Sequence, residues 1–589
     1  MVKKSSIRIC LISLLSVVSS YVLAGPVDVR TARIKAEKFF NAELENDVVS
    51  QSVDRDYVSL NPLCVSETRS ANEVPEYYVF IPEDSVGFVI VAGEDGVEPV
   101  VGYSLNSRFS GQQLPPALDK YLASYQKYIH KLRDGWQCPP MKRRANVRLV
   151  KPFITTTWNQ GYPYNYYTPK IGSERTLAGC FAIAIAQIMK YYEWPVAGKG
   201  TCTATLKNST NTQRTINLGK EYDWANMLDD YTGSYTNIEK TAVAALIRDV
   251  GYACSSIYGT NETWAYTVDA LKALLRHFYY SPEIRLVDRK YYSDETWAKM
   301  LQEELTLGRP VWFCGQDENE QGGHSFICCG IDSQGRYYIN WGWGGYCDGY
   351  FDLNAFSPDQ YAYNIDQQAI INIVPMDEEE SEDEFELIPH VGNLEIIDQW
   401  NFLSNPGLTY NIYVTNTSDQ VISGKVGLSI SGSDGEATSE TMEVKYYDGI
   451  EPNWWWRYEL FTEFDGAEFQ TKGIREIRFF WQPEGSDDWF TPLGENNVLY
   501  METTDAGHYF HTERPEGVPD NIRDVVADDV EVSISGNVML LMSSKRTNVD
   551  VYSINGKVVR RLELVPNRLT SVPLNTGVYI VNGRKFVVN

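Results

Sequence analysis

The sequence predicts an α+β protein of several domains, in which a mixed first half is followed by β-sandwich domains. Its 589 residues are too many for one hydrophobic core and are enough for three or four domains. Up to residue 375, apolar residues at helical spacing alternate with short strand-like runs. Beyond it, short alternating strands are separated by Gly, Ser and Asn, which is typical of β-sandwiches.

The first region, residues 26–145, predicts a small mixed domain. Its expected helices and strands lie at 32–40, 77–81, 88–92, 100–103 and 118–132. Gly135 follows the second helix as a C-cap. The basic cluster at 142–144 is interpreted as an exposed, cleavable linker, although such a run is often only a solvated loop.

The acidic run at 377–384 repels itself and indicates a linker, with a calcium site as the weaker alternative because regular loop spacing is absent. Strands are expected after it, at 409–416 and 425–430. The tryptophans at 454–456 are either a sugar- or protein-binding surface or packed strand residues.

The last 60 or so residues again predict strands, with an Asn-Gly hairpin turn at 555–556. The expected strands are 549–553, 557–562, 577–581 and 585–588.

The composition limits the possible partners. Hydrophobic residues make up 43% and aromatic residues 13% of the chain, as in folded globular domains. The formal net charge of -26 argues against nucleic acid and against an anionic membrane surface, and its simplest reading is solubility.

The N-terminus has the pattern of a secretory signal peptide. Lys3, Lys4 and Arg8 precede an apolar stretch at 9–23, and cleavage is expected after Ala24. A membrane anchor is the alternative, but the stretch is short and interrupted by serines. No other segment is apolar and long enough to span a bilayer.

The cysteine pattern does not suggest a metal site. The chain has ten cysteines, and Cys10 would leave with the signal, so at least one of the others cannot pair within the chain. There is no CxxC pair, which makes structural zinc unexpected. Cys328 and Cys329 lie in an apolar run and are expected to be buried core thiols.

Cys180 is the candidate nucleophile. It directly follows Gly179 and begins a run of strong helix formers at 181–190. A helix N-terminus stabilises a thiolate, so we expect a lowered pKa for Cys180. The alternative is an inert core thiol.

His324 is the candidate general base. Gly323 and its neighbouring glycine allow close approach of the backbone, and the apolar run that follows predicts a buried strand. The alternative is a histidine that merely satisfies a local hydrogen bond. His277 lies in an expected helix and is interpreted as structural.

Two further side chains complete the candidate site. The Gln160 amide and the Cys180 N–H are expected to hold an oxyanion. Asn340 follows a strand and is expected to orient the imidazole, with Trp341 and Trp343 shielding that hydrogen bond. A Trp-Gly turn built only for packing is the alternative.

These residues together resemble the streptopain-type peptidases, family C10 of the papain-like superfamily. The segments that carry the resemblance are 158–165 (WNQGYPYN), 179–191, 322–326 (GGHSF) and 340–345 (NWGWGG). The resemblance implies a papain-like domain with Cys180 as nucleophile, His324 as base, Asn340 as orienting group and Gln160 as oxyanion donor. It further implies that Trp341, Trp343, Gly323 and Gly179 line or shield the substrate site.

Two flanking regions carry resemblances of their own. Segments 87–93 and 101–103 are similar to the streptopain propeptide, and 549–559 and 577–581 are similar to the type IX secretion sorting domain of Bacteroidetes. The expected segments are a signal peptide at 1–24, an inhibitory pro-domain at 25–147, a peptidase domain at 148–375, an acidic linker at 376–386, an Ig-like β-sandwich at 387–520 and a sorting domain at 525–589.

The expected function is a secreted cysteine endopeptidase that forms a thioester with its substrate and needs no cofactor or metal. The resemblance implies a preference for an apolar side chain at the second residue before the cut. Its expected partners are protein substrates, its own pro-domain and the secretion machinery of a Gram-negative bacterium, reached through the periplasm. A papain-like amidase or acyltransferase, and a non-enzymatic surface binder or inhibitor, are the alternatives.

Overall fold

The fold is described from a computed structural model. It covers residues 25–46, 57–65, 74–110, 114–134, 147–289, 292, 294–315, 324–353, 367–376, 389–400, 406–418, 420–430, 442–452, 455–464, 472–486, 489–490, 492–493, 498–512, 515, 530–535, 538–543, 547–553, 558–564, 570–573, 577–581 and 584–588. Among the helices of these ranges, none has both the length and the apolar character needed to cross a membrane.

Some sequence predictions fall outside the described residues. They are the signal peptide at 1–24, Gly135, the basic cluster at 142–144, Gly323, the acidic run at 377–384, Trp454 and the Asn-Gly turn at 555–556.

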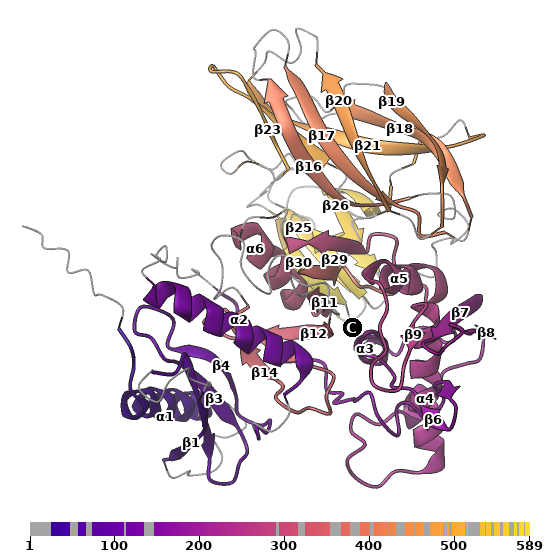
Figure 1. Ribbon diagram of the computed structural model, residues 1–589. Helices are drawn as coiled ribbons and strands as arrows, with labels where there is room; N and C mark the ends of the chain where they lie inside the picture. The colour runs from indigo at the N-terminus through magenta and orange to yellow at the C-terminus, as the bar shows by residue number, and fades with distance from the viewer. Residues whose placement is uncertain are drawn as a thin grey trace, which may run out of the picture.

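The N-terminal region consists of two helices and four antiparallel strands, and all of them except β1, which was not predicted, lie close to the ranges expected from sequence. They are α1 (Val29–Asn46), β1 (Leu60–Val65), β2 (Tyr77–Pro82), β3 (Phe88–Ala92), β4 (Val100–Ser104) and α2 (Pro116–Arg133). Helix α1 packs on one face of the strands through Ala32, Ala36 and Phe40. Helix α2 packs on the opposite face (Figure 1) through residues such as Leu118 and Tyr121.

The following region, up to residue 376, is a mixed domain. Its helices are α3 (Cys180–Tyr192), η2 (Trp224–Asn226), α4 (Asn237–Ala253), α5 (Thr267–Lys272), η3 (Ala273–His277) and α6 (Asp294–Thr306). Its strands are β5 (Lys170–Ile171), β6 (Glu174–Arg175), β7 (Thr201–Leu206), β8 (Gln213–Asn217), β9 (Ile257–Tyr258), β10 (Arg285–Asp288), β11 (Val311–Gly315), β12 (His324–Ile331), β13 (Tyr337–Asn340), β14 (Gly349–Phe351) and β15 (Gln368–Ile371).

One ten-stranded sheet joins these two regions. Its order is β1-β2-β3-β4-β14-β13-β12-β11-β15-β10. The junction is the antiparallel pair β4–β14, in which Tyr350 lies opposite Tyr103 and Phe351 opposite Gly102. The sequence predicted two neighbouring domains but gave no sign that they share a sheet, because this pairing joins residues about 250 positions apart.

The two faces of this sheet are covered by different helices. Ile327 and Cys329 of β12 point into the core that contains α3 and α4. Phe326 and Cys328 point into the core that contains α2 and α6. This alternation follows from the two-residue period of a strand. Both neighbouring cysteines are buried, as predicted.

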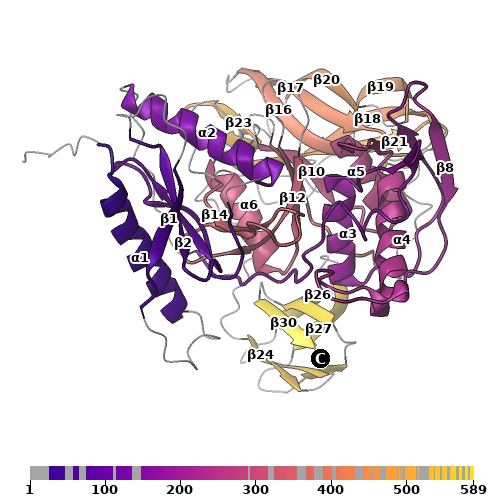
Figure 2. The same cartoon turned by 60° about the horizontal axis from the view of Figure 1, so that its bottom comes forward.

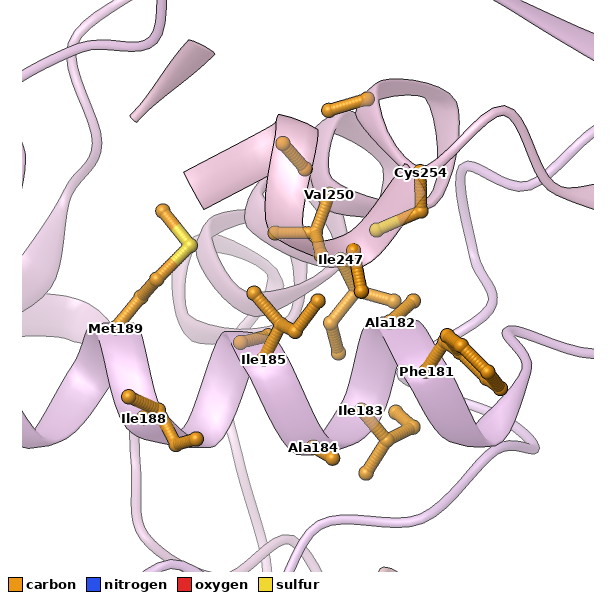
Figure 3. Close-up of a cluster of buried hydrophobic side chains, with 14 of the residues drawn as sticks. Phe181, Ala182, Ile183, Ala184, Ile185, Ile188, Met189, Ile247, Val250 and Cys254 are labelled. Carbon is orange, nitrogen blue, oxygen red and sulfur yellow. The ribbon is translucent and has the colours of Figure 1, made fainter. Parts of the chain in front are cut away.

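Helix α3 is buried along most of its length. All residues from Phe181 to Met189 are buried, which explains why its sequence is apolar on nearly every side. Figure 3 shows its contact with α4, where Ile185 of α3 lies beneath Ile247 and Val250. Helix α3 therefore holds its first residue, Cys180, on a rigid element.

The second half forms two pairs of stacked sheets, as the predicted β-sandwiches require. The first pair consists of β16 (His390–Trp400), β17 (Gly407–Thr415), β18 (Ile422–Ile430), β19 (Met442–Ile450), β20 (Trp455–Glu463), β21 (Gly473–Pro483), β22 (Val498–Thr503) and β23 (His508–His511). The second consists of β24 (Val530–Ser535), β25 (Val538–Ser543), β26 (Thr547–Ser553), β27 (Val558–Leu564), β28 (Thr570–Pro573), β29 (Gly577–Val581) and β30 (Arg584–Val588). Figure 2 shows the two sandwiches on opposite sides of the mixed domain.

The first sandwich is docked on the mixed domain. Leu493 is 4% exposed and packs in the same core as α3. The His390 Nε2 atom donates to the Ile284 carbonyl at 3.1 Å, and Arg276 donates to the Thr417 hydroxyl at 3.0 Å.

Candidate active site

Cys180 is the first residue of α3, and the chain before it is fixed from two sides. Gly179 has φ +92°, and a Cβ there would lie 2.9 Å from Thr263 Cγ2, so a side chain is excluded. The Ala178 N–H donates to the Gln160 carbonyl at 3.0 Å. The Cys180 thiol is thereby placed at the junction of the segments around Gln160 and Thr263.

The thiol of Cys180 is half-buried, and burial raises its pKa above the ordinary value. Hydrogen bonding from Ser325 and from the amide of Phe181 acts in the opposite direction but does not outweigh burial. The pKa shift expected from the sequence was downward. It is wrong for this state, because the helix N-terminus acts alone, without a paired cation, in a desolvated position.

His324 is the first residue of β12 and lies opposite Gly315 of β11. Because Ile327 and Cys329 point into the core of α3 and Phe326 and Cys328 into that of α2, strand alternation assigns His324 to the face on which α2 lies. Burial lowers the pKa of His324 to about 4, and the Lys120 ammonium of α2 lowers it further against the opposing charge of Glu262. Within the described part of the chain, no hydrogen bond joins the imidazole to Cys180 or Asn340.

Asn340 ends β13 and is buried. Its Nδ2 atom donates to the Thr156 carbonyl at 2.8 Å, and its Oδ1 atom accepts from the Gly342 N–H at 3.0 Å. Its side chain also lies 3.3 Å from that of Gln187. Asn340 is therefore locked in place without the imidazole it was expected to orient.

Gln187 is a site residue that the sequence analysis missed. It is fully buried in α3, and its Oε1 atom accepts from the Trp158 N–H at 3.1 Å while its amide contacts Asn340. One amide thus connects helix α3, the segment before Gln160 and the end of β13. The available signal was a single polar residue within the buried, otherwise apolar run from Phe181 to Met189.

Gln160 is half-buried beside Cys180, anchored by its carbonyl and by its own N–H, which donates to Asn159 Oδ1 at 2.5 Å. Its neighbourhood is tied to the Gly-rich turn after Asn340, since the Gly344 N–H donates to the Trp158 carbonyl at 3.0 Å. The structure therefore places the main chain of Gln160 close to Cys180 and to the turn, and the role of Gln160 as oxyanion donor stays a prediction.

The two tryptophans of that turn differ. Trp341 is 2% exposed and packs against Phe326 and Phe351, with ring centroids 5.1 and 5.2 Å apart. Its backbone N–H donates to Asp348 at 2.9 Å. Burial raises the pKa of Asp348 to about 7. Trp343 is half-buried, so Trp341 is mainly a core residue beneath the turn and Trp343 is the more accessible ring.

Arg336 of the mixed domain contacts the N-terminal region. Its guanidinium is buried, pairs with Asp332 at 3.0 Å and Glu98 at 3.2 Å, and donates to the Val100 carbonyl at 3.1 Å. It also lies over the Phe39 ring at 5.1 Å. Asp332 belongs to the mixed domain and the other three partners belong to the N-terminal region, so Arg336 anchors one to the other.

Comparison with known proteins identifies both regions. The Peptidase C10 family model matches residues 158–351, and a model described as Spi protease inhibitor matches residues 24–129. The active interpain A cysteine protease of Prevotella intermedia is 33% identical, with 98% of its chain and 40% of this one covered and a TM-score of 0.35.

This chain belongs to the peptidase C10 family. A fragment of prointerpain A from the same organism is 28% identical, with 100% of the fragment and 54% of this chain covered and a TM-score of 0.46. Streptopain of Streptococcus pyogenes is 28% identical over 405 residues, which cover its whole length and 63% of this chain.

The thiol protease/hemagglutinin PrtT of Porphyromonas gingivalis is 27% identical over 382 residues. The match covers 60% of this chain but only 43% of PrtT. The prediction of a C10 cysteine peptidase with an inhibitor-type pro-domain is confirmed. The assignment of residues 525–589 to type IX secretion stays a prediction.

Proposed function

We propose that this C10 peptidase is made as a latent endopeptidase in which Cys180 is the nucleophile and His324 becomes its base after the pro-domain leaves. The observation that carries the proposal is the placement of Cys180 at the start of buried helix α3, beside Gln160 and close to the strand that begins with His324. A rigid nucleophile with an oxyanion donor beside it is the arrangement that acyl transfer needs.

The chemistry follows from these positions. The Cys180 thiolate attacks the scissile carbonyl carbon, and the resulting oxyanion accepts from the Gln160 amide and the Cys180 N–H, each contributing about 3 kcal/mol. Protonated His324 gives its proton to the leaving nitrogen as the C–N bond breaks, which leaves a thioester. His324 then removes a proton from water, which attacks the thioester and releases Cys180. Asn340 orients the imidazole during these transfers.

We infer that latency follows from the face of the sheet to which strand alternation assigns His324. Pairing with Gly315 keeps His324 in the strand, and a strand residue changes face only when it leaves the ladder. Helix α2 covers the opposite face and places Lys120 near the imidazole. Since protonated His324 would be repelled by Lys120, the arrangement favours a neutral histidine that is separated from the thiol.

Export is a further part of the proposal. We infer that residues 1–24 direct the chain out of the cytoplasm and that residues 525–589 are read by a type IX secretion system. Deleting 525–589 should then leave the enzyme in the periplasm of a type IX-competent host. Normal appearance of the truncated chain in the medium would contradict the sorting role.

The test of the enzymatic proposal compares the purified chain from residue 25 with its Cys180→Ala variant on a gel over time, with sequencing of new N-termini. We expect the parent to trim itself near residues 140–150 and the variant to do so only when processed parent is added. If neither chain is cut under reducing conditions, even with processed parent present, the zymogen proposal fails. Retained thiol reactivity without protein cleavage would favour an amidase or acyltransferase.

A further inference from the structure

A second cysteine lies beneath the nucleophile. Cys314 is on β11, directly opposite Ser325 of β12, and the backbone of Ser325 lies close enough to the Cys180 thiol to lower the pKa of that thiol. The start of α3 covers the same stretch of β11, because the Phe181 ring lies 5.0 Å from that of Trp312, two residues before Cys314 on the same strand face. Cys180 and Cys314 are therefore neighbours in one core, although they are 134 positions apart in the sequence.

The electrostatics agree with this placement. Burial raises the pKa of Cys314 to about 12, and the charge of Cys180 raises it further, while the Thr267 hydroxyl acts in the opposite direction. The other described cysteines sense different partners, since the pKa of Cys254 responds to Cys202. Among the described thiols whose pKa shifts, Cys314 is the one whose pKa is raised by the charge of Cys180.

We propose that Cys314 is a resolving thiol, which forms a disulfide with Cys180 after a peroxide has oxidised the nucleophile. The disulfide would keep the peptidase in an inactive form that thiols can restore. This inference rests on the proposed role of Cys180 as nucleophile.

The reaction takes place in two steps. The Cys180 thiolate attacks one oxygen of hydrogen peroxide, so that an S–O bond forms, the O–O bond breaks and hydroxide leaves; sulfur is oxidised to a sulfenic acid and peroxide is reduced. The Cys314 sulfur then attacks the Cys180 sulfur, so that the S–S bond forms and the S–O bond breaks. The departing hydroxide takes the Cys314 proton and becomes water.

The raised pKa of Cys314 slows the second step, because little of it is thiolate at neutral pH. The fixed position of Cys314 on β11 speeds this step, because a thiol held next to the sulfenic acid does not need to diffuse to it. Two equivalents of an external thiol then reduce the disulfide and return both cysteines to thiols. Without Cys314, further peroxide would carry Cys180 to the sulfinic acid, which thiols do not reverse.

The experiment treats the self-processed enzyme with hydrogen peroxide and then with dithiothreitol. Activity is normalised to each protein before treatment, and intact mass and tryptic peptides are read without reduction. We expect the parent to lose the mass of two hydrogens, to yield one peptide pair joined through Cys180 and Cys314, and to recover most of its activity. Cys314→Ala should gain the mass of two or three oxygens and recover less than about a tenth of its activity.

Cys329→Ala is the matched control, because Cys329 is equally buried in the same core and should leave recovery unchanged. The joined peptide in the parent is the deciding readout if Cys314→Ala does not fold, and Cys314→Ser then provides the second variant. Absence of the joined peptide, with equal recovery in parent and variant, would overturn the inference. Failure of the proposed function is a different result, in which Cys180→Ala still cleaves protein.

Discussion

The junction between the pro-domain and the peptidase can be tested with one methyl group. Gly102 of β4 lies opposite Phe351 of β14, and a Cβ at Gly102 would stand 2.5 Å from Phe351 Cδ1 and 2.8 Å from its Cε1. Phe351 is fully buried between Tyr121 and Trp341, with ring centroids 5.7 and 5.2 Å away. The ring has no free space to move into, so Gly102→Ala should force β4 and β14 apart.

The size of the effect follows from the cost of overpacking. One extra methyl group in a filled core costs about 1–3 kcal/mol. If this cost falls on the docked state, the detached state becomes about 5- to 150-fold more populated. Self-processing should accelerate by a similar factor, because detachment frees β12 and the nucleophile.

The assay is a gel time course of the chain from residue 25. Gly233→Ala is the matched control, since a Cβ at Gly233 meets no atom within 4 Å. Each change is also made in Cys180→Ala, where limited trypsin digestion reports detachment without self-cleavage. Combining Gly102→Ala with Phe351→Leu should be less disruptive than the sum of the two. Processing of Gly102→Ala at the parental rate, with an unchanged digestion pattern, would refute the reasoning.

Three further predictions concern buried polar groups. Gln187→Leu removes the contact with Asn340 and should lower kcat/KM of the processed enzyme roughly 10- to 100-fold in a peptide assay. Burial lowers the pKa of His390 to about 4, so the stabilising effect of the neutral imidazole is present above pH 6.5 and is lost as pH falls towards 4. In urea unfolding at pH 7 and pH 4.5, the stability of His390→Leu should therefore depend less on pH than that of the parent. Burial raises the pKa of Asp348 to about 7, so the stability of the protein should fall as pH rises from about 4 to 7. Asp348→Asn keeps an oxygen that accepts from the Trp341 N–H and should remove this loss of stability in the same measurement.

The sequence predicted those features that depend on local periodicity. Helix α3 and strands β3, β12 and β29 were expected within a few residues of their bounds. The reason is that the 3.6- and 2-residue periods of apolar side chains can be recognised within a short stretch of sequence. The start of α3 directly after Gly179 is a local feature of the same kind.

Features that depend on distant packing were not predicted. The shared sheet needs the pairing of Tyr103 with Tyr350, and no local pattern encodes it. The direction of the Cys180 pKa shift was wrong because burial is decided by all elements around α3 together. Gln187 looked like one polar residue in an apolar helix, and only the fold shows that its amide reaches Asn340.

The position of His324 indicates why a pro-domain that packs beside the sheet can control an active site within it. A strand residue points to one face or the other, with no stable intermediate, so the step that brings the imidazole to the thiol behaves as a two-state change. Helix α2 covers the face opposite Cys180, where Lys120 keeps the imidazole neutral. Strand β4 joins the N-terminal region to the same sheet through its pairing with β14. Changes at Gly102 or Arg336 should therefore shift one shared equilibrium and alter the rate of activation. A change at Gln187 should leave that equilibrium in place and alter the activity of the processed enzyme instead.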